Sequence, residues 1–246
     1  MIVIAPKYIK VRFVLFVSLI SILGCILGGT VLYNLFSVSD VSSGINKYST
    51  VIIDPGHGGP DGGTSAANGT LEKEINLQIA LKLNDILCSM GVETVMVRTE
   101  DISIHEESAK TIREKKISDI KNRLGIMNNT DNSVFVSIHQ NHYSQSKYNG
   151  TQVFYSKNNP DSAILADSIR HSVITVLQPD NSRETKIAGS EIYLLHHAEI
   201  PAVMVECGFL SNSDETEKLK NDNYQRKLAF LIALGILDFI NKTEAV

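Results

Sequence analysis

Two histidines and two glutamates stand where predicted strands end or a predicted helix begins. His57, His139 and Glu206 each follow or end an apolar run that is typical of a buried strand. Glu72 falls in the first turn of the helix expected after the first of these strands. Because the carboxyl ends of parallel strands share one edge of a sheet, the four side chains can converge there although they lie far apart in sequence.

These residue types suit a metal centre. Two imidazoles and one carboxylate are a recurring ligand set for catalytic zinc, with the fourth position left to water. Zinc would lower the pKa of that water towards about 7 and would polarise a bound carbonyl group. A second carboxylate would then be needed to move protons. The four residues together therefore indicate a zinc-dependent reaction on a carbonyl compound.

The turn that carries His57 is rich in glycine. The apolar run Val51–Ile53 leads into Asp54, Pro55 and Gly56, and two further glycines follow the histidine. Backbone of this kind can approach a ligand closely. Taken alone, the turn fits equally well a histidine that merely caps it, so a functional role for His57 depends on its partners.

For two of these residues, a neighbour of the same type is an alternative candidate for metal binding. Glu74 could take the place of Glu72, which by itself is an ordinary acid favoured in a first helical turn by the helix dipole. His142 could take the place of His139, although His139 directly follows the apolar strand. Glu206 has a weaker structural explanation, because an unpaired carboxylate is costly to bury without a function.

Strand and helix patterns alternate along the chain. Apolar residues at spacings of three and four predict helices at residues 71–90, 102–129, 160–177 and 224–240. Short apolar or alternating runs predict strands at residues 51–53, 92–97, 133–138, 150–155, 192–195 and 201–206. This order implies one α/β domain with a twisted, mostly parallel central sheet flanked by helices.

Composition narrows the class of protein. A chain of 246 residues with 43% hydrophobic residues is expected to fold around a packed core. Its formal net charge is -4 and it has no basic stripe, which argues against a nucleic-acid partner. Three cysteines, at 25, 88 and 207, are too few for a disulfide framework and too scattered for a thiolate zinc site.

The N-terminal segment has the pattern of a membrane anchor. Residues 1–12 are basic and predicted to be cytoplasmic, and the uncharged, mostly apolar stretch 13–36 is long enough to span a bilayer. Residues 37–48 would form a linker, 49–241 a catalytic domain on the extracytoplasmic side, and 242–246 a tail. A cleavable signal peptide is the competing interpretation of residues 13–36, but no A-x-A-like cleavage site follows them.

Four ordered motifs carry a family resemblance. IDPGHGG at 53–59, LEKEINL at 71–77, SIHQN at 137–141 and PAVMVECGFLSN at 201–212 closely resemble the zinc-dependent N-acetylmuramoyl-L-alanine amidases. The resemblance covers residues 49–240 and implies a peptidoglycan hydrolase that cuts the amide between the lactyl group of muramic acid and the first L-alanine of the stem peptide. It implies that His57, Glu72 and His139 bind zinc and that Glu206 is the general acid/base, which ranks Glu72 above Glu74.

Further residues are assigned weaker roles. Asp54 and Asn141 are expected to orient ligands, and Arg98 and Arg123 sit where the family has arginines. His196 and His197 depart from the family pattern; they could line the substrate groove or be exposed loop histidines.

Within the family, the chain resembles the short, membrane-tethered sporulation type, which acts on spore-cortex peptidoglycan, prepares muramic-δ-lactam formation and so serves germination. The segment 155–201 has no room for the long inhibitory helix of some relatives, so an open cleft is expected, and an accessory lipoprotein is a possible partner. Two alternatives remain open: a non-catalytic peptidoglycan-binding module on the same fold, and a thiol hydrolase that uses Cys207.

Overall fold

The computed structural model describes residues 47–244. The predicted basic segment, the predicted membrane helix and nearly all of the linker lie outside this range. Among the helices of residues 47–244, none is both long and apolar enough to cross a membrane.

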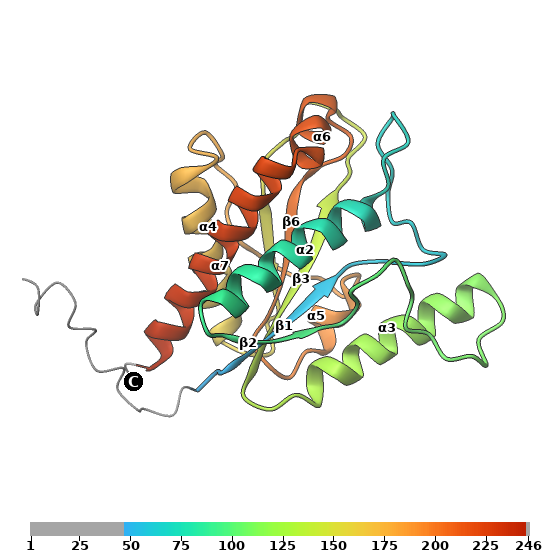
Figure 1. Ribbon diagram of the computed structural model, residues 1–246, viewed down its shortest axis with the longest axis horizontal. Coiled ribbons are helices and arrows are strands. Elements are labelled where there is room, and N and C mark those ends of the chain that lie inside the picture. The colour runs from blue at the N-terminus through green and yellow to red at the C-terminus, as the bar shows by residue number, and fades with distance from the viewer. Residues whose placement is uncertain (1–46, 245–246) are drawn as a thin grey trace, which may run out of the picture. The chain divides into compact units, whose positions relative to one another are not determined.

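A six-stranded sheet forms the centre of the domain, in the order β2-β1-β3-β6-β4-β5 (Figure 1). Its strands are β1 Thr50–Pro55, β2 Glu93–Met96, β3 Ser133–Asn141, β4 Gln152–Tyr155, β5 Lys186–Ile187 and β6 Ala202–Phe209. Every neighbouring pair is parallel except β4 and β6, which run antiparallel. The predicted α/β domain is therefore confirmed, with a mixed sheet in which β2, β1, β3 and β6 bring their carboxyl ends to one edge.

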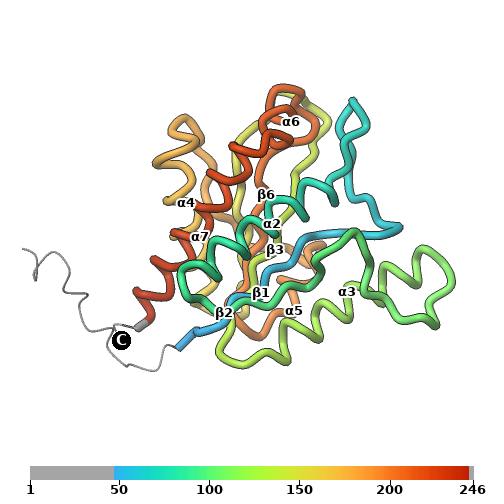
Figure 2. The backbone as a smooth tube through the Cα atoms, in the orientation of Figure 1, coloured from blue at the N-terminus to red at the C-terminus, as the bar shows by residue number. Residues whose placement is uncertain are grey.

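Helices cover both faces of this sheet. They are α2 Glu72–Ser89, α3 Ile112–Asn128, α4 Asp161–Val176, α5 Tyr193–His197, α6 Ser213–Lys220 and α7 Asp222–Glu244. α2, α4 and α7 pack together on one face, whereas α3 and α5 lie on the other (Figure 1). The tube in Figure 2 shows the same arrangement, with β1, β3 and β6 side by side between the two groups of helices.

The apolar strands are explained by burial on both faces. Val51 and Ile53 contribute to the core under α2, α4 and α7, whereas Ile52 contributes to the core under α3 and α5. All three are fully buried. Strands covered on both sides need apolar residues at successive positions, which is why the sequence shows runs here instead of strict alternation.

One predicted strand is wrong. Residues 192–195 were expected to be extended, but the structure places them at the start of the short helix α5, where His196 N donates to Ile192 O at 2.9 Å. Leu194 and Leu195 are both buried, so this short segment shows neither helical nor strand periodicity. The long helix expected from residue 102 begins only at Ile112, where Thr111 and Glu114 form a capping box.

Candidate functional site

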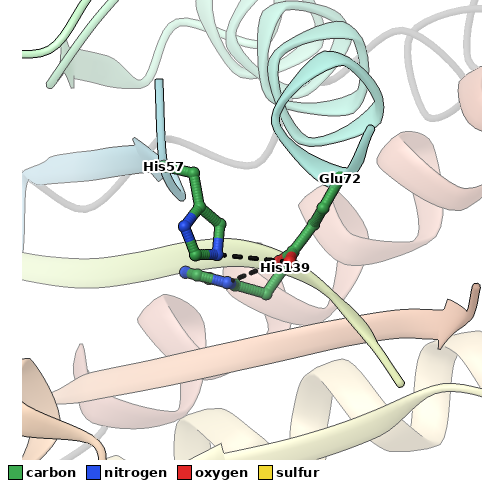
Figure 3. Close-up of side chains that lie close together, drawn as sticks. All are labelled: His57, Glu72 and His139. Atoms are coloured by element: carbon green, nitrogen blue, oxygen red, sulfur yellow. Dashed lines mark hydrogen bonds and ion pairs between the residues drawn. The ribbon is translucent and has the colours of Figure 1, made fainter. Parts of the chain in front are cut away.

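His57, Glu72 and His139 meet at the carboxyl edge of the sheet. His57 follows β1, His139 lies near the end of β3, and Glu72 is the first residue of α2. The two oxygens of Glu72 bind one imidazole each, His57 Nε2 at 3.2 Å and His139 Nδ1 at 2.8 Å (Figure 3). A ligand atom from each of the three residues lies within 4.8 Å of the others. The predicted convergence is thus present, in a geometry that can hold a metal ion.

Backbone geometry makes room for this cluster. A Cβ on Gly56 would lie 2.1 Å from His139 Nε2, and one on Gly63 would lie 2.5 Å from Glu72 Oε2. His57 itself adopts a φ of 63°, which is uncommon for a residue with a side chain. Strain of this kind persists only where the surroundings enforce it, and it is frequent at functional sites.

Glu72 is buried and held in its ionised form. Its Oε2 accepts from Thr64 N at 2.9 Å, and its Oε1 accepts from Gln140 N at 3.1 Å. Burial opposes ionisation, but hydrogen bonds and positive charge from His139 and His57 keep the pKa of Glu72 well below its usual range. The competitors Glu74 and His142 are exposed, and neither belongs to the cluster.

Asp61 is a residue that the sequence interpretation missed. Its Oδ2 lies 2.9 Å from His57 Nδ1, and its Oδ1 lies 2.7 Å from Lys116 Nζ. A carboxylate on one imidazole nitrogen fixes the tautomer and directs the other nitrogen to a metal. Here that other nitrogen is the one facing Glu72, so the ligands and their support fit a divalent ion. The Asp61–His57 spacing of four residues was visible in the sequence, but the loop conformation that joins them was not.

Replacing Asp61 by asparagine should weaken zinc binding about 10- to 100-fold, the usual effect of losing a carboxylate that orients a ligand histidine. Competition with a chromogenic chelator measures this affinity. Asp85→Asn, on the exposed surface of α2, is the matched control and should bind zinc normally. Equal affinities in the two variants would show that Asp61 does not support the site.

Glu206 lies beside the three clustered residues, and one of its carboxylate oxygens has no hydrogen-bond partner in the described part of the chain. It is paired with His139 across β3 and β6, and its Oε2 is buried without a hydrogen-bond partner among the described residues. Burial raises the pKa of Glu206 to about 7; the charge of Glu72 acts in the same direction, whereas those of His139 and His57 oppose it. A carboxyl group that exchanges its proton near neutral pH suits general acid/base chemistry.

Asp54, Arg98 and Arg123 support the backbone of the His57 turn. The buried Asp54 carboxylate pairs with Arg123 and accepts from Ser137 Oγ at 2.6 Å. Arg123 also donates to His57 O at 2.7 Å, and Arg98 Nη2 donates to Gly56 O at 3.0 Å. All three residues lie close to the site. The two arginines bind main-chain carbonyl oxygens of the turn, and Asp54 binds Arg123.

His196 and His197 are placed differently. Their carbonyl oxygens accept from Asn158 and Asn128. Asn128 ends α3 shortly before β3 begins, and Asn158 follows the antiparallel strand β4. The backbone of both histidines therefore lies towards the opposite edge of the sheet from Glu206.

Asn141 and Cys207 also lie apart from the ligands. Asn141 follows a register irregularity in β3 and lines a separate pocket. Cys207 is fully buried in the core, where burial raises the pKa of its thiol. An inaccessible, protonated thiol cannot act as a nucleophile, so the thiol-hydrolase alternative is wrong.

A pocket of about 290 Å³ opens beside the ligands. His57 and His139 line it together with Lys116 and Asp119 of α3 and Tyr193 of α5. The segment predicted as a strand thus contributes a wall of the site as a helix.

Comparisons with known proteins agree with this geometry. The chain is 32% identical over 192 residues to the germination-specific N-acetylmuramoyl-L-alanine amidase of Bacillus subtilis (strain 168), a match that covers 78% of this chain and 80% of that protein. It is 41% identical to the CwlD amidase from Clostridioides difficile, solved in complex with the GerS lipoprotein, with a TM-score of 0.76 over 79% of this chain and 99% of that one. An N-acetylmuramoyl-L-alanine amidase from Clostridium difficile 630 gives 31% identity and a TM-score of 0.67, covering 79% of this chain and 98% of that one. Residues 51–238 match the family Amidase_3, described as N-acetylmuramoyl-L-alanine amidase, and the chain belongs to this family.

Proposed function

We propose that this amidase uses a zinc ion held by His57, Glu72 and His139 to hydrolyse the amide between the lactyl group of N-acetylmuramic acid and L-alanine of the stem peptide. The observation that carries the proposal is the convergence of these three ligands beside the buried, unpartnered carboxylate oxygen of Glu206. When bound, zinc would supply Lewis-acid polarisation of the amide carbonyl and activation of a water molecule.

The protein's own groups supply proton transfer and positioning. With its pKa near 7, Glu206 can accept a proton from the attacking water and return it to the departing nitrogen of L-alanine. Asp61 fixes the ring of His57, and Arg123 fixes its carbonyl oxygen. The site is thereby positioned before substrate arrives, which lowers the reorganisation needed during the reaction.

We further propose a role in spore-cortex maturation and germination. The relative in Bacillus subtilis is described as germination-specific, which supports this setting. The complex of the CwlD amidase with the GerS lipoprotein supports an accessory lipoprotein as a partner. In this setting, residues 13–36 would anchor the chain in a membrane with the catalytic domain on the extracytoplasmic side.

Zinc removal tests the mechanism. Dye release from labelled peptidoglycan should stop after chelation and return when zinc is added, and mass spectrometry should show stem peptides with a free L-alanine amine. His139→Ala should be inactive, whereas the exposed His142→Ala should behave as wild type.

Full activity after verified zinc removal would refute the metal mechanism, and zinc-loaded protein that cleaves nothing would favour the binding-module alternative. Cortex and vegetative peptidoglycan should be compared in the same assay.

A further inference from the structure

A second pocket, of about 210 Å³, lies next to the catalytic edge. Aromatic rings and cations dominate its lining, which includes Tyr143, Tyr148, Phe154, Phe209, Arg183 and Lys186. We refer to it as the aromatic–cation pocket.

This pocket is separate from the site but adjoins it along the sheet. Gln152 lines the pocket and is paired with Glu206 across β4 and β6, so both side chains point to the same face. Asn141, another lining residue, lies two positions beyond His139 in β3. A molecule held at Glu206 can therefore extend over β4 towards Lys186 of β5.

The cations of this pocket lack carboxylate partners. The guanidinium of Arg183 lies 4.6 Å from the centroid of Phe209 and 5.7 Å from that of Tyr148, and its Nε donates to Asn149 O at 2.9 Å. These contacts hold the guanidinium in place. Within residues 47–244, neither Arg183 nor Lys186 has a carboxylate within 4.0 Å. The pocket thus presents positive charge that no direct salt bridge among the described residues neutralises, although Glu215 is near enough to Arg183 for the two charges to interact.

The pocket beside the metal ligands carries charges of both signs. Asp61 and Asp119 line it, but each is paired with a cation of α3, Asp61 with Lys116 at 2.7 Å and Asp119 with Arg123 at 2.6 Å. Within the described part of the chain, Arg183 and Lys186 make no such salt bridge, so they remain available to a carboxylate of the substrate that reaches this far along the sheet.

We propose that the aromatic–cation pocket binds a free carboxylate of the stem peptide and so selects peptides that carry one. The inference rests on the proposed function. Two strand spacings separate β6 from β5, about 10 Å, which an extended peptide covers in about three residues. The carboxylate bound by Arg183 and Lys186 would therefore lie about three residues beyond the scissile amide.

Two substrates and two variants test this subsite. Muramyl tetrapeptide with free carboxylates is compared with the same compound in which every carboxylate is a carboxamide. The wild type should show a KM about tenfold lower for the free acid, as one charge-assisted contact typically gives, with similar kcat. The double variant Arg183→Gln, Lys186→Gln should lose this preference, while Lys227→Gln on the exposed surface of α7 should keep it.

The outcomes separate the subsite from the reaction. Equal KM values in the wild type, or an undiminished preference in the double variant, would overturn the subsite. If the double variant does not fold, Lys186→Gln alone should reduce the preference about threefold, because Lys186 is exposed and makes no ion pair. If the wild type cleaves neither compound, the proposed function fails, but the subsite can still be tested by measuring the binding of both compounds by calorimetry. Tighter binding of the free acid would support the subsite, and equal binding would refute it.

Discussion

Replacing Glu206 by glutamine should lower kcat by about 10²- to 10⁴-fold, the usual contribution of a positioned general acid/base. Glutamine keeps the size of the side chain but can neither take up nor release the proton that the reaction moves. Because Glu206 is not one of the three ligands, zinc content should stay at the wild-type level. Dye release and metal analysis on the same preparation measure both quantities.

Glu74→Gln is the matched control for this variant. It makes the same chemical change on an exposed position of α2 and should leave kcat unchanged. A Glu206→Gln protein that cuts peptidoglycan at the normal rate would remove Glu206 from the mechanism.

The pH profile provides an independent check on Glu206. Its pKa of about 7 means that the carboxylate, the form that accepts a proton, is lost as the pH falls through that value. kcat/KM should therefore fall on the acidic side of neutrality, and a bound cation would move this limb to lower pH. In Glu206→Gln the residual activity should lack the limb. A wild-type profile with no acidic limb at any pH at which the protein stays folded would contradict the assignment.

Replacing Asp54 by asparagine should destabilise the domain by about 1.5–3 kcal/mol, because it removes one of the two carboxylates that pair with the buried Arg123 and leaves Asp119 as the other. The side chains of Asp54 and Arg123 are only 1% and 4% exposed, so water cannot compensate. Urea unfolding followed by circular dichroism measures the loss. The exposed partner of another pair gives the control: Asp101→Asn should cost less than about 1 kcal/mol.

Acid should weaken the same pair. Burial opposes ionisation of Asp54, but the charge of Arg123 and the hydrogen bond from Ser137 lower its pKa in the folded state. A lowered folded-state pKa stabilises the fold above the unfolded value, about 3.9, and this contribution disappears as the pH falls through the folded value. The stability difference between wild type and Asp54→Asn should therefore be constant near neutrality and should shrink in acid. A difference that grows in acid would show that the carboxylate is not the stabilising form.

Sequence patterns were sufficient to predict that His57, Glu72 and His139 converge, because the ends of the strands are visible in the sequence. Runs of buried residues mark where β1, β3 and β6 lie, and a parallel sheet brings their ends together whatever the details of packing. The choice of Glu72 over Glu74 needed the motif as well as the pattern. Both glutamates fall in the first turn of α2, and only the orientation of that helix places Glu72 between the imidazoles.

The supporting residues were harder to predict because their partners are main-chain atoms or loop positions. Arg98 and Arg123 bind carbonyl oxygens of the His57 turn. Every residue has a main-chain carbonyl, so the pattern of side chains does not predict which one an arginine binds. Asp61 depends on the left-handed conformation of His57, which residue type does not suggest. α5 is five residues long, too short for its periodicity to differ from that of a strand.

Both the backbone and the ring of His57 are tied to α3. Arg123 binds the His57 carbonyl oxygen directly, and Lys116 reaches the imidazole through Asp61. The two α3 residues are seven positions apart, about two helical turns, and so lie on the same side of the helix. Among the described residues, no hydrogen bond joins the side chain of Glu72 or His139 to α3. Of the three residues proposed to hold the metal, only His57 is thus fixed by side chains of α3, so the position of this helix helps to set the position of His57 relative to Glu72 and His139.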